Sequence, residues 1–133
     1  MTRYFESNED TRLNRGLYLV KYTGKGRQDK PKNPILYIEK GCCKFGQSQA
    51  LDKVEERYIN HFKPEEKVIE MHILARLRDR DDIDQIEKKM HEAFKSRRLI
   101  NDNNRMSEWM QPDDIRALKK EFKSILLQHF SVK

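Results

Sequence analysis

The sequence predicts a small α/β (α+β) domain in which a mainly antiparallel sheet of three or four strands is flanked by about three helices. Runs rich in β-branched and aromatic residues predict strands at 16–23, 35–46 and 68–77. Apolar residues at helical spacing predict helices at 52–62, 83–94 and 111–130. We expect residues 1–133 to form one domain, because a chain of this length supports a single modest core.

The composition limits the class of protein. Hydrophobic residues make up 36% of the chain and charged residues 38%, and the mean hydropathy is -0.99, so the core is thin. The 28 basic and 22 acidic residues leave a net charge of +6, which fits a polyanionic partner. No apolar run approaches the roughly 20 residues that cross a bilayer, and the start lacks the apolar region of a signal peptide. We therefore expect no membrane association and an intracellular, cytoplasmic location, or a nuclear or host-cell location if the protein is viral.

The two cysteines, Cys42 and Cys43, are adjacent in the sequence. Neighbouring side chains on a strand point to opposite faces, so a bridge between them would be strained. We expect both to be reduced and one of them to be buried. No second cysteine pair or spaced histidine pair accompanies them, which argues against a structural zinc site.

The first part of the chain predicts a lead-in and a strand. Residues 1–14 are polar and mixed in charge, and we expect a loosely ordered segment or a short helix there. The strand that follows places Leu17 and Leu19 on one face and Tyr18 and Val20 on the other, with its tyrosines on a single side.

The stretch 24–34 is rich in glycine, proline and charge, and it predicts an exposed loop. Four of its basic residues suit contacts with a phosphate backbone: Lys25, Arg27, Lys30 and Lys32. The next stretch, 35–46, predicts two short strands joined by a tight hairpin turn at Lys40-Gly41.

In the helix at 52–62, Asp52 is expected to cap the amide of Glu55, whose carboxylate reaches back in a capping box. One face of this helix is apolar and should pack on the sheet; it carries Val54, Tyr58 and Phe62. Arg57 and His61 stand one turn apart on the neighbouring surface. A guanidinium and an imidazole above a strand that ends near Lys44 suit a grip on a phosphodiester.

The strand at 68–77 should place Ile69, Met71 and Ile73 on one face. Asp81 or Asp82 is expected to cap the next helix. The apolar stripe of that helix consists of Ile83, Ile86, Met90, Ala93 and Phe94.

Glu87 falls within roughly 60° of the centre of that stripe, at about 100° per residue, so it leans toward the sheet. A carboxylate there is costly unless it pairs with a cation or a metal. Arg57, a nearby lysine and a metal ion are the three partners that the sequence leaves open.

The C-terminal part begins with a polar connection at 96–111, which Trp109 should anchor as an ordered functional loop. A C-terminal packing helix at 111–130 then opens with Pro112, with Asp113 and Asp114 at its positive end. Its apolar stripe consists of Ile115, Leu118, Phe122, Ile125 and Leu126, and we expect it to cover the core.

Several of these residues together resemble the motifs of the GIY-YIG endonuclease superfamily, a small α/β fold with a three-stranded antiparallel sheet. Gly16-Leu17-Tyr18 is similar to the first motif and Lys44-Phe45-Gly46 to the second, in the form found in some phage, viral and restriction enzymes that begins with lysine. Arg57 matches the arginine of the motif helix, and His61 matches a histidine four residues later. Glu87 resembles the acidic metal ligand.

The stretch Ser107-Glu108-Trp109-Met110 resembles a Glu-Trp-aromatic signature of the viral and phage branch, so the motifs cover about residues 16 to 110. The gap between Tyr18 and Lys44 is longer than in compact members. Tyr37, which is nearer to Lys44, is therefore a rival for the first tyrosine.

The resemblance implies a metal-dependent DNA endonuclease that uses one divalent ion, Mg²⁺ or Mn²⁺, and no organic cofactor. Glu87 would hold the ion, with Glu108 as the alternate ligand. Arg57 would clamp the phosphate, while Lys44 or Tyr18 would take a proton from water through a lowered pKa and His61 would orient or share it. The alternatives are a catalytically inactive nucleic-acid-binding module of this fold and, more weakly, a protein-interaction module.

Overall fold

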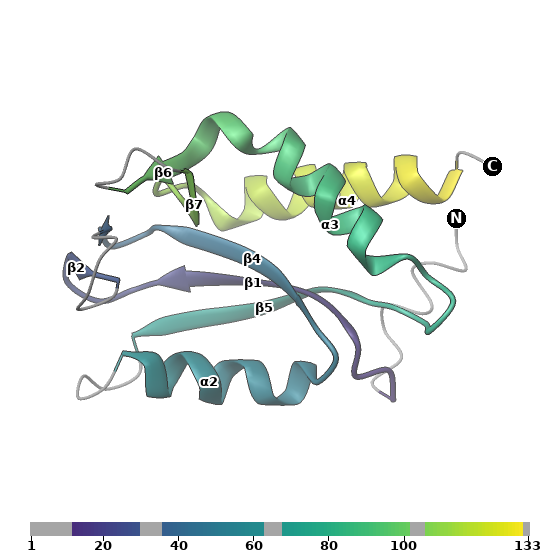
Figure 1. Cartoon of the computed structure of the whole chain (residues 1–133), viewed down its shortest axis with the longest axis horizontal. Helices are drawn as coiled ribbons and strands as arrows, with labels where there is room; N and C mark the ends of the chain where they lie inside the picture. Colours follow the sequence, from purple (N-terminus) through teal and green to yellow (C-terminus); the bar gives the residue numbers. More distant parts are fainter. Residues whose placement is uncertain (1–11, 30–35, 63–67, 102–105, 132–133) are drawn as a thin grey trace.

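The computed structural model describes residues 12–29, 36–62, 68–101 and 106–131. Within these ranges it contains a five-stranded sheet, a separate two-stranded sheet and three α-helices (Figure 1). All strand pairs are antiparallel. The predicted α/β class, with an antiparallel sheet and three flanking helices, is confirmed.

The large sheet has the strand order β5-β1-β4-β7-β6. Its strands are β1 (Gly16–Tyr22), β4 (Cys43–Ser48), β5 (Ile69–Arg76), β6 (Arg98–Ile100) and β7 (Met106–Met110). The small sheet pairs β2 (Arg27–Gln28) with β3 (Tyr37–Ile38). The helices are α2 (Val54–His61), α3 (Ile83–Ala93) and α4 (Ile115–Ser131), and single 3-10 turns cover Leu51–Lys53 and Lys95–Arg97.

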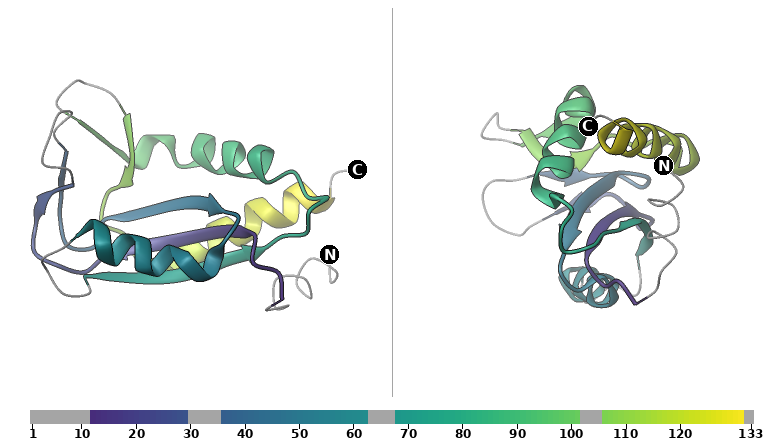
Figure 2. Two further views of the ribbon diagram at one scale, coloured as in Figure 1. Left: turned by 60° about the horizontal axis from the view of Figure 1, so that its bottom comes forward. Right: turned by 90° about the vertical axis from the view of Figure 1, so that its right-hand side faces the viewer.

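Helices cover both faces of the large sheet, with α2 on one side and α3 and α4 on the other (Figures 1 and 2). Alternation along β1 sends Leu17 and Leu19 into the core beneath α3 and α4. Tyr18 and Val20 point into a second core beneath α2. The predicted division of β1 into two faces is confirmed, and each face is buried in its own core.

The polar stretch expected as a functional loop contributes strands β6 and β7 to the large sheet. They pair with each other, and β7 pairs with β4 through Cys43↔Met110 and Lys44↔Trp109. Trp109 is 2% exposed and anchors this addition in the α2 core. The sheet therefore has more strands than the sequence predicted, because β6 and β7 are short and hold their register through distant partners.

The hairpin predicted for 35–46 is wrong in its pairing. Gly41 does make a turn, with φ of 99°, but β3 pairs with β2 in the small sheet and β4 pairs with β1 and β7. Arg27↔Ile38 and Gln28↔Tyr37 are the partners across the small sheet. The stretch 24–34, expected to be a loop, therefore contains the strand β2. It is β2, and not β4, that pairs with β3.

The helix caps were predicted with mixed success. Asp82 Oδ1 accepts a hydrogen bond from Gln85 N at 3.1 Å, so Asp82 caps α3. The capping box at Asp52 is wrong, because α2 starts at Val54 without a side-chain cap. Asn14 instead holds Asp52, donating from Nδ2 to Asp52 Oδ1 at 2.7 Å and accepting from Asp52 N at 3.0 Å.

The packing helices follow their predicted stripes with one exception. Ile83, Ile86, Met90 and Phe94 of the first stripe are buried, whereas Ala93 is exposed at the end of α3. In α4, Leu118, Phe122 and Leu126 are buried, with Ile115 and Ile125 partly buried against the same core. Residues 1–11 of the expected lead-in lie outside the described residues.

Both cysteines are free, and both are buried, so the expectation that only one would be buried is wrong. Cys42 belongs to the α2 core and Cys43 to the core beneath α3 and α4. Covering of both sheet faces explains why each thiol is buried. None of the described helices combines the length and apolar character that a membrane span requires.

Candidate functional site

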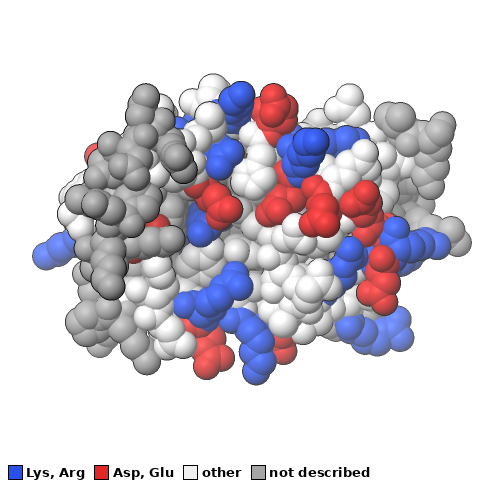
Figure 3. Space-filling view, in the orientation of Figure 1, with Lys and Arg blue, Asp and Glu red and all other residues white. Residues whose placement is uncertain are grey.

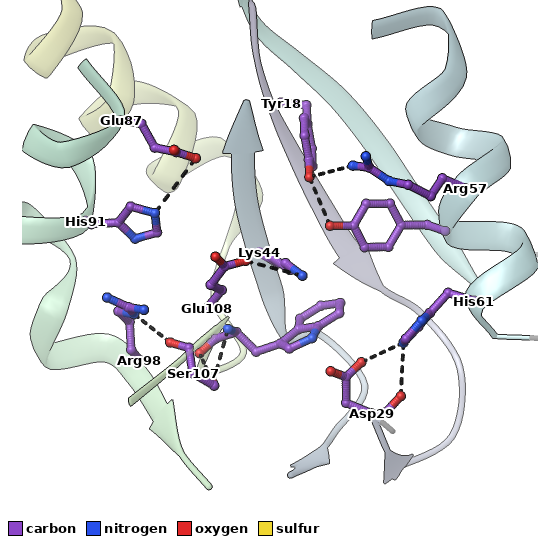
Figure 4. A network of polar contacts seen from close by, with 12 residues as sticks. Tyr18, Asp29, Lys44, Arg57, His61, Glu87, His91, Arg98, Ser107 and Glu108 are labelled. Atoms are coloured by element: carbon purple, nitrogen blue, oxygen red, sulfur yellow. Dashed lines mark hydrogen bonds and ion pairs between the residues drawn. The ribbon is translucent and has the colours of Figure 1, made fainter. Parts of the chain in front are cut away.

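Tyr18 lies in the core beneath α2 and is only 4% exposed, and its hydroxyl is the centre of a group of polar contacts. Arg57 Nη2 donates a hydrogen bond to Tyr18 Oη at 3.0 Å, and Tyr58 Oη lies 3.0 Å from the same oxygen (Figure 4). The two phenol rings meet edge to face, with centroids 6.0 Å apart. Tyr18 of β1 and Arg57 of α2 are thus in direct contact.

The local backbone explains how these groups meet. Tyr18 pairs with Gly46 across β1 and β4. A Cβ at Gly46 would lie 2.7 Å from Tyr18 Oη, so the glycine leaves the space that the phenol occupies. On α2, Tyr58 faces inward while Arg57 starts from the exposed surface and reaches back to the hydroxyl.

Lys44 joins this group from β4. Its Nζ lies 5.5 Å from the centroid of the Tyr58 ring and 5.8 Å from that of Trp109, both within cation–π range. It also forms an ion pair with Glu108, with Nζ 3.4 Å from Oε2. Arg57 Cζ lies 5.5 Å from the centroid of the same Tyr58 ring, so two cations share one aromatic ring. We call Tyr18, Lys44, Arg57, Tyr58 and Glu108 the Tyr18 cluster.

The pKa of Tyr18 differs from what a general base requires. Burial, followed by the neighbouring Tyr58, raises the pKa of Tyr18 well above its ordinary value, although Arg57 and Lys44 act in the opposite direction. Without a metal ion, Arg57 and Lys44 alone do not lower the pKa of Tyr18 to the range that a general base needs. In this state Tyr18 acts as a neutral hydroxyl that orients Arg57.

Glu87 lies on the other side of β4. Gln47 Nε2 donates to Glu87 Oε1 at 2.9 Å and to Asp84 Oδ1 at 2.6 Å. His91 Nε2 lies 3.8 Å from Glu87 Oε2, and its ring packs on Phe45 with centroids 4.4 Å apart. The predicted lean of Glu87 toward the sheet is confirmed, and its observed partners are Gln47 and His91, not Arg57 or a lysine.

The hydrogen bond from His91 lowers the pKa of the Glu87 carboxyl below its ordinary value. Partial burial acts in the opposite direction, and the Gln47 amide lowers the pKa further. Glu87 is thus a carboxylate at neutral pH, as a ligand for a hard cation must be. We call Gln47, Asp84, Glu87 and His91 the Glu87 cluster.

The two clusters meet at Gly46 and Gln47 of β4. Gly46 lies against Tyr18, and its neighbour Gln47 contacts Glu87. β4 runs between the two groups, as Figure 4 shows. The pairing of β4 with β7 covers Cys43 and Lys44 and does not extend to Gly46 and Gln47. The two clusters therefore lie on opposite faces of β4 at adjacent residues.

His61 lies one helical turn beyond Arg57, but it contacts Asp29 and not Tyr18. His61 Nε2 lies 3.0 Å from both the backbone oxygen and the Oδ1 atom of Asp29. Figure 4 shows Arg57 and His61 leaving α2 on the same side, with Arg57 directed to Tyr18 and His61 to Asp29. The structure therefore brings His61 beside the Tyr18 cluster without a direct bond to it.

The remaining predicted residues lie around the small sheet. Tyr37 is 58% exposed on β3 and takes no part in the Tyr18 cluster. Lys25 is exposed, whereas the Arg27 guanidinium lies 5.3 Å from the Phe62 ring centroid and donates to Phe62 O at 3.3 Å. Lys30 and Lys32 lie outside the described residues. On the face seen in Figure 3, acidic side chains gather over α3 with basic side chains among them.

The fit of a divalent ion depends on the carboxylates. Among the described residues, no group of three or more His, Cys, Asp or Glu is arranged to hold a metal ion. Mg²⁺ is commonly held by one or two carboxylates and keeps several waters. Asp84 Oδ1 and Glu87 Oε1 both accept hydrogen bonds from one atom, the nitrogen Nε2 of Gln47, so the two carboxylates lie close together. The Glu87 cluster therefore offers two neighbouring carboxylates, the donor type that Mg²⁺ prefers, while Glu108 is paired with Lys44.

Sequence reasoning missed four members of the two clusters, Tyr58, Gln47, Asp84 and His91, and also Asp29, which contacts His61. Tyr58 lies on the sheet-facing side of its helix by pattern, and that pattern carries no signal for the contact of its hydroxyl with Tyr18. Asp84 precedes Glu87 by one helical turn, a spacing that would have signalled a carboxylate pair. Asp29 is the sole acidic residue between Lys21 and Ile38, and this isolation in a basic stretch was the available signal.

Comparisons of the chain with models of protein families, with curated proteins and with solved structures found no match.

Proposed function

We propose that the protein is a metal-dependent DNA endonuclease that hydrolyses phosphodiester bonds. The observation that carries this proposal is the contact between Arg57 and the Tyr18 hydroxyl, with Lys44 beside the same Tyr58 ring. A guanidinium and an ammonium held together on one face of a sheet suit a phosphodiester, which needs two or more donors of positive charge.

Each side chain has a role that its environment supports. Arg57 is an exposed residue whose Nη2 donates to Tyr18, and the planar fork of a guanidinium suits the binding of phosphate oxygens. Lys44 adds a second positive charge, and Glu108 offsets that charge until a phosphate replaces it. Tyr18 and Tyr58 keep the guanidinium in one orientation, which limits the entropy lost when substrate binds.

Glu87, with Asp84 beside it, is the proposed holder of Mg²⁺ or Mn²⁺. When bound, the ion would stabilise the negative charge that develops on the phosphate and on the leaving oxygen. The position of the Glu87 cluster supports this assignment, because Gln47, which contacts Glu87, directly follows Gly46, which lies against Tyr18.

The test is a supercoiled-plasmid nicking assay with Mg²⁺, with Mn²⁺ and with a chelator. We expect nicking with either ion and none with the chelator. Arg57→Lys keeps the charge but loses the planar fork, and it should lower the nicking rate about 10- to 100-fold. The matched control is Arg116→Lys on the exposed side of α4, which should nick at the parent rate.

Two results would contradict the proposal. One is a parent protein that nicks with neither ion, and the other is an Arg57→Lys variant that is as active as the parent. The folded state of each variant is checked by circular dichroism, and we expect Arg57→Lys to cost up to about 1 kcal/mol because Arg57 donates a hydrogen bond to the buried Tyr18 hydroxyl.

A second candidate is a nucleic-acid-binding module that does not cleave. The raised pKa of Tyr18 favours it, since a protonated phenol cannot take a proton from water. The pairing of Glu108 with Lys44 favours it as well. Salt-dependent DNA binding without nicking in any divalent ion would select this candidate.

A further inference from the structure

Asp29 is the one residue of the described chain that is both charged and buried, at 9% exposed. A carboxylate removed from water is costly unless it is paired and hydrogen-bonded. The observed partner of its Oδ1 atom is His61 Nε2, at 3.0 Å. The side chain of Asp29 is 11% exposed and that of His61 is 33% exposed, so the carboxylate is the inner member of the pair.

Asp29 is held on several sides. Its N–H donates to Leu36 O at 2.7 Å, directly after the pairing of β2 with β3. Its backbone oxygen lies 3.0 Å from His61 Nε2. Arg27, two residues earlier, bonds the backbone oxygen of Phe62 and covers the Phe62 ring, which ties β2 to the end of α2. The carboxylate is therefore fixed against the last turn of the helix that also carries Arg57.

This geometry selects one tautomer of His61. The two atoms facing Nε2 are a carbonyl oxygen and a carboxylate oxygen, and both can only accept. Nε2 must therefore carry the hydrogen, and in the neutral ring Nδ1 is left as the nitrogen that accepts a proton. A carboxylate behind a histidine also stabilises the imidazolium that forms when Nδ1 is protonated.

We propose that Asp29 is a positioning residue that holds His61 with Nδ1 free as the proton acceptor for phosphodiester hydrolysis. This inference rests on the proposed nuclease function and adds a residue and an atom to it. The i, i+4 spacing places His61 beside Arg57, so a phosphate bound by the guanidinium adjoins the imidazole. Tyr18, whose pKa burial raises, is then not required as the base.

The step is balanced without a further reactant. A water molecule gives a proton to His61 Nδ1 as its oxygen donates an electron pair to phosphorus and forms the new P–O bond. The bond from phosphorus to the leaving oxygen breaks, that oxygen keeps the electron pair, and it takes up a proton from a solvent water. The proton on Nδ1 is returned to solvent, which restores the neutral ring.

The test compares two carboxylate–histidine pairs of the same chain. Asp29→Asn keeps the size of the side chain but removes its charge. The control is Glu70→Gln, because Glu70 Oε2 lies 2.5 Å from His72 Nε2 on β5, on the sheet face opposite the Tyr18 cluster. Each variant is measured for plasmid nicking and for the imidazole signals in long-range proton–nitrogen spectra of the protein without metal.

We expect the parent spectrum to show His61 protonated at Nε2, with that proton far downfield because its acceptor is charged. Asp29→Asn should move the proton upfield and lower the nicking rate about 10- to 100-fold, part of the 10²- to 10⁴-fold that proton transfer by a positioned group contributes. Glu70→Gln should change neither the His61 signal nor the nicking rate.

The outcomes separate this inference from the proposed function. A parent spectrum with His61 protonated at Nδ1 overturns the inference even if the protein nicks DNA. An Asp29→Asn variant with the expected spectral change and an unchanged nicking rate shows that the pair is only structural, and the nuclease proposal stands. A parent protein that never nicks removes the catalytic role of His61 together with the proposed function, and the spectrum still decides the tautomer.

Discussion

The hydroxyl of Tyr18 connects the groups that would contact a phosphate. It accepts a hydrogen bond from Arg57 and contacts the hydroxyl of Tyr58, and its ring occupies the space above Gly46. Because these contacts are made inside a core, they exist before any ligand binds. The orientation of Arg57 is therefore a property of the folded chain.

We predict that Tyr18→Phe lowers the nicking rate about 10-fold or more, because it frees the guanidinium of Arg57. It should destabilise the protein by about 1 kcal/mol, the usual contribution of a hydrogen bond. Tyr37→Phe is the matched variant, and it should leave the rate unchanged because Tyr37 is exposed on β3. The reverse order of rates would move the site to the small sheet.

Glu87→Gln should abolish nicking and weaken Mn²⁺ binding, because it removes a charge from the two carboxylates that converge on Gln47 Nε2. The buried stripe of α3 should keep the variant folded. Glu108→Gln should retain most of the activity, since Glu108 is paired with Lys44. Calorimetric titration with Mn²⁺ and the nicking assay measure both effects, and normal cleavage by Glu87→Gln would transfer the ligand role to Glu108.

At the scale of elements, β4 is the strand that organises the site. Its odd-numbered residues Phe45 and Gln47 face α3, and Lys44 and Gly46 face α2. One strand therefore serves both clusters, and the absence of a side chain at Gly46 is what allows the Tyr18 hydroxyl to lie close to the backbone.

We predict that Gly46→Ala displaces Tyr18 and strongly reduces nicking, since its Cβ would lie 2.7 Å from Tyr18 Oη. Overpacking of this kind costs about 1–3 kcal/mol. Gly24→Ala is a matched control, because its Cβ would lie at the same 2.7 Å from the hydroxyl of Tyr22, outside both clusters. We expect the two variants to lose similar free energy of unfolding, while only Gly46→Ala loses cleavage. That result would show that Gly46 is needed to place Tyr18.

The elements that sequence predicted well are those specified by local pattern. The α3 stripe and its Asp82 cap lie within a few residues of each other, as do the alternating faces of β1. The pairing of β2 with β3 and the β6–β7 hairpin depend on short strands with distant or polar partners, which periodicity does not reveal. The capping box failed for the same reason, since Asn14 binds Asp52 from 38 residues away.

The candidate site was predicted in its residue types more than in its contacts. The Arg57–Tyr18 contact and the nearby Lys44 follow from motif positions on adjacent elements. The pairing of His61 with Asp29 requires the fold of the small sheet, which no local pattern describes. The raised pKa of Tyr18 likewise depends on burial beneath α2 and on the neighbouring Tyr58.

At the scale of the whole molecule, the small sheet and the β6–β7 hairpin lie at one end (Figures 1 and 2). Lys25 is exposed there, while Arg27 is packed against Phe62. Since the large sheet is covered on both faces by helices, DNA would approach this end and the adjoining surface of α2 and β4.

We predict that neutralising Lys25, Arg27, Lys30 and Lys32 together weakens DNA binding and flattens its salt dependence, by roughly 0.9 in log–log slope for each lost phosphate contact. Lys25→Ala alone should change the slope more than Arg27→Ala, because the Arg27 guanidinium already contacts Phe62. Neutralising four exposed basic residues of α4 is the control: Arg116, Lys119, Lys120 and Lys123. Equal slopes for the two multiple variants would show that the loop does not contact DNA.

The two buried cysteines provide a way to observe the two cores separately. Burial raises the pKa of Cys43 to about 12 and also raises that of Cys42, so neither thiol should react with a disulfide reagent at pH 8 while the protein is folded. The variant Cys42→Ala keeps only the thiol of Cys43, beneath α3 and α4. The variant Cys43→Ala keeps only the thiol of Cys42, beneath α2. Rapid stoichiometric labelling of the native protein would contradict this expectation. Different slow rates would show that the layer beneath α2 and the layer beneath α3 and α4 open independently, so that two adjacent residues report on motions on opposite sides of the sheet.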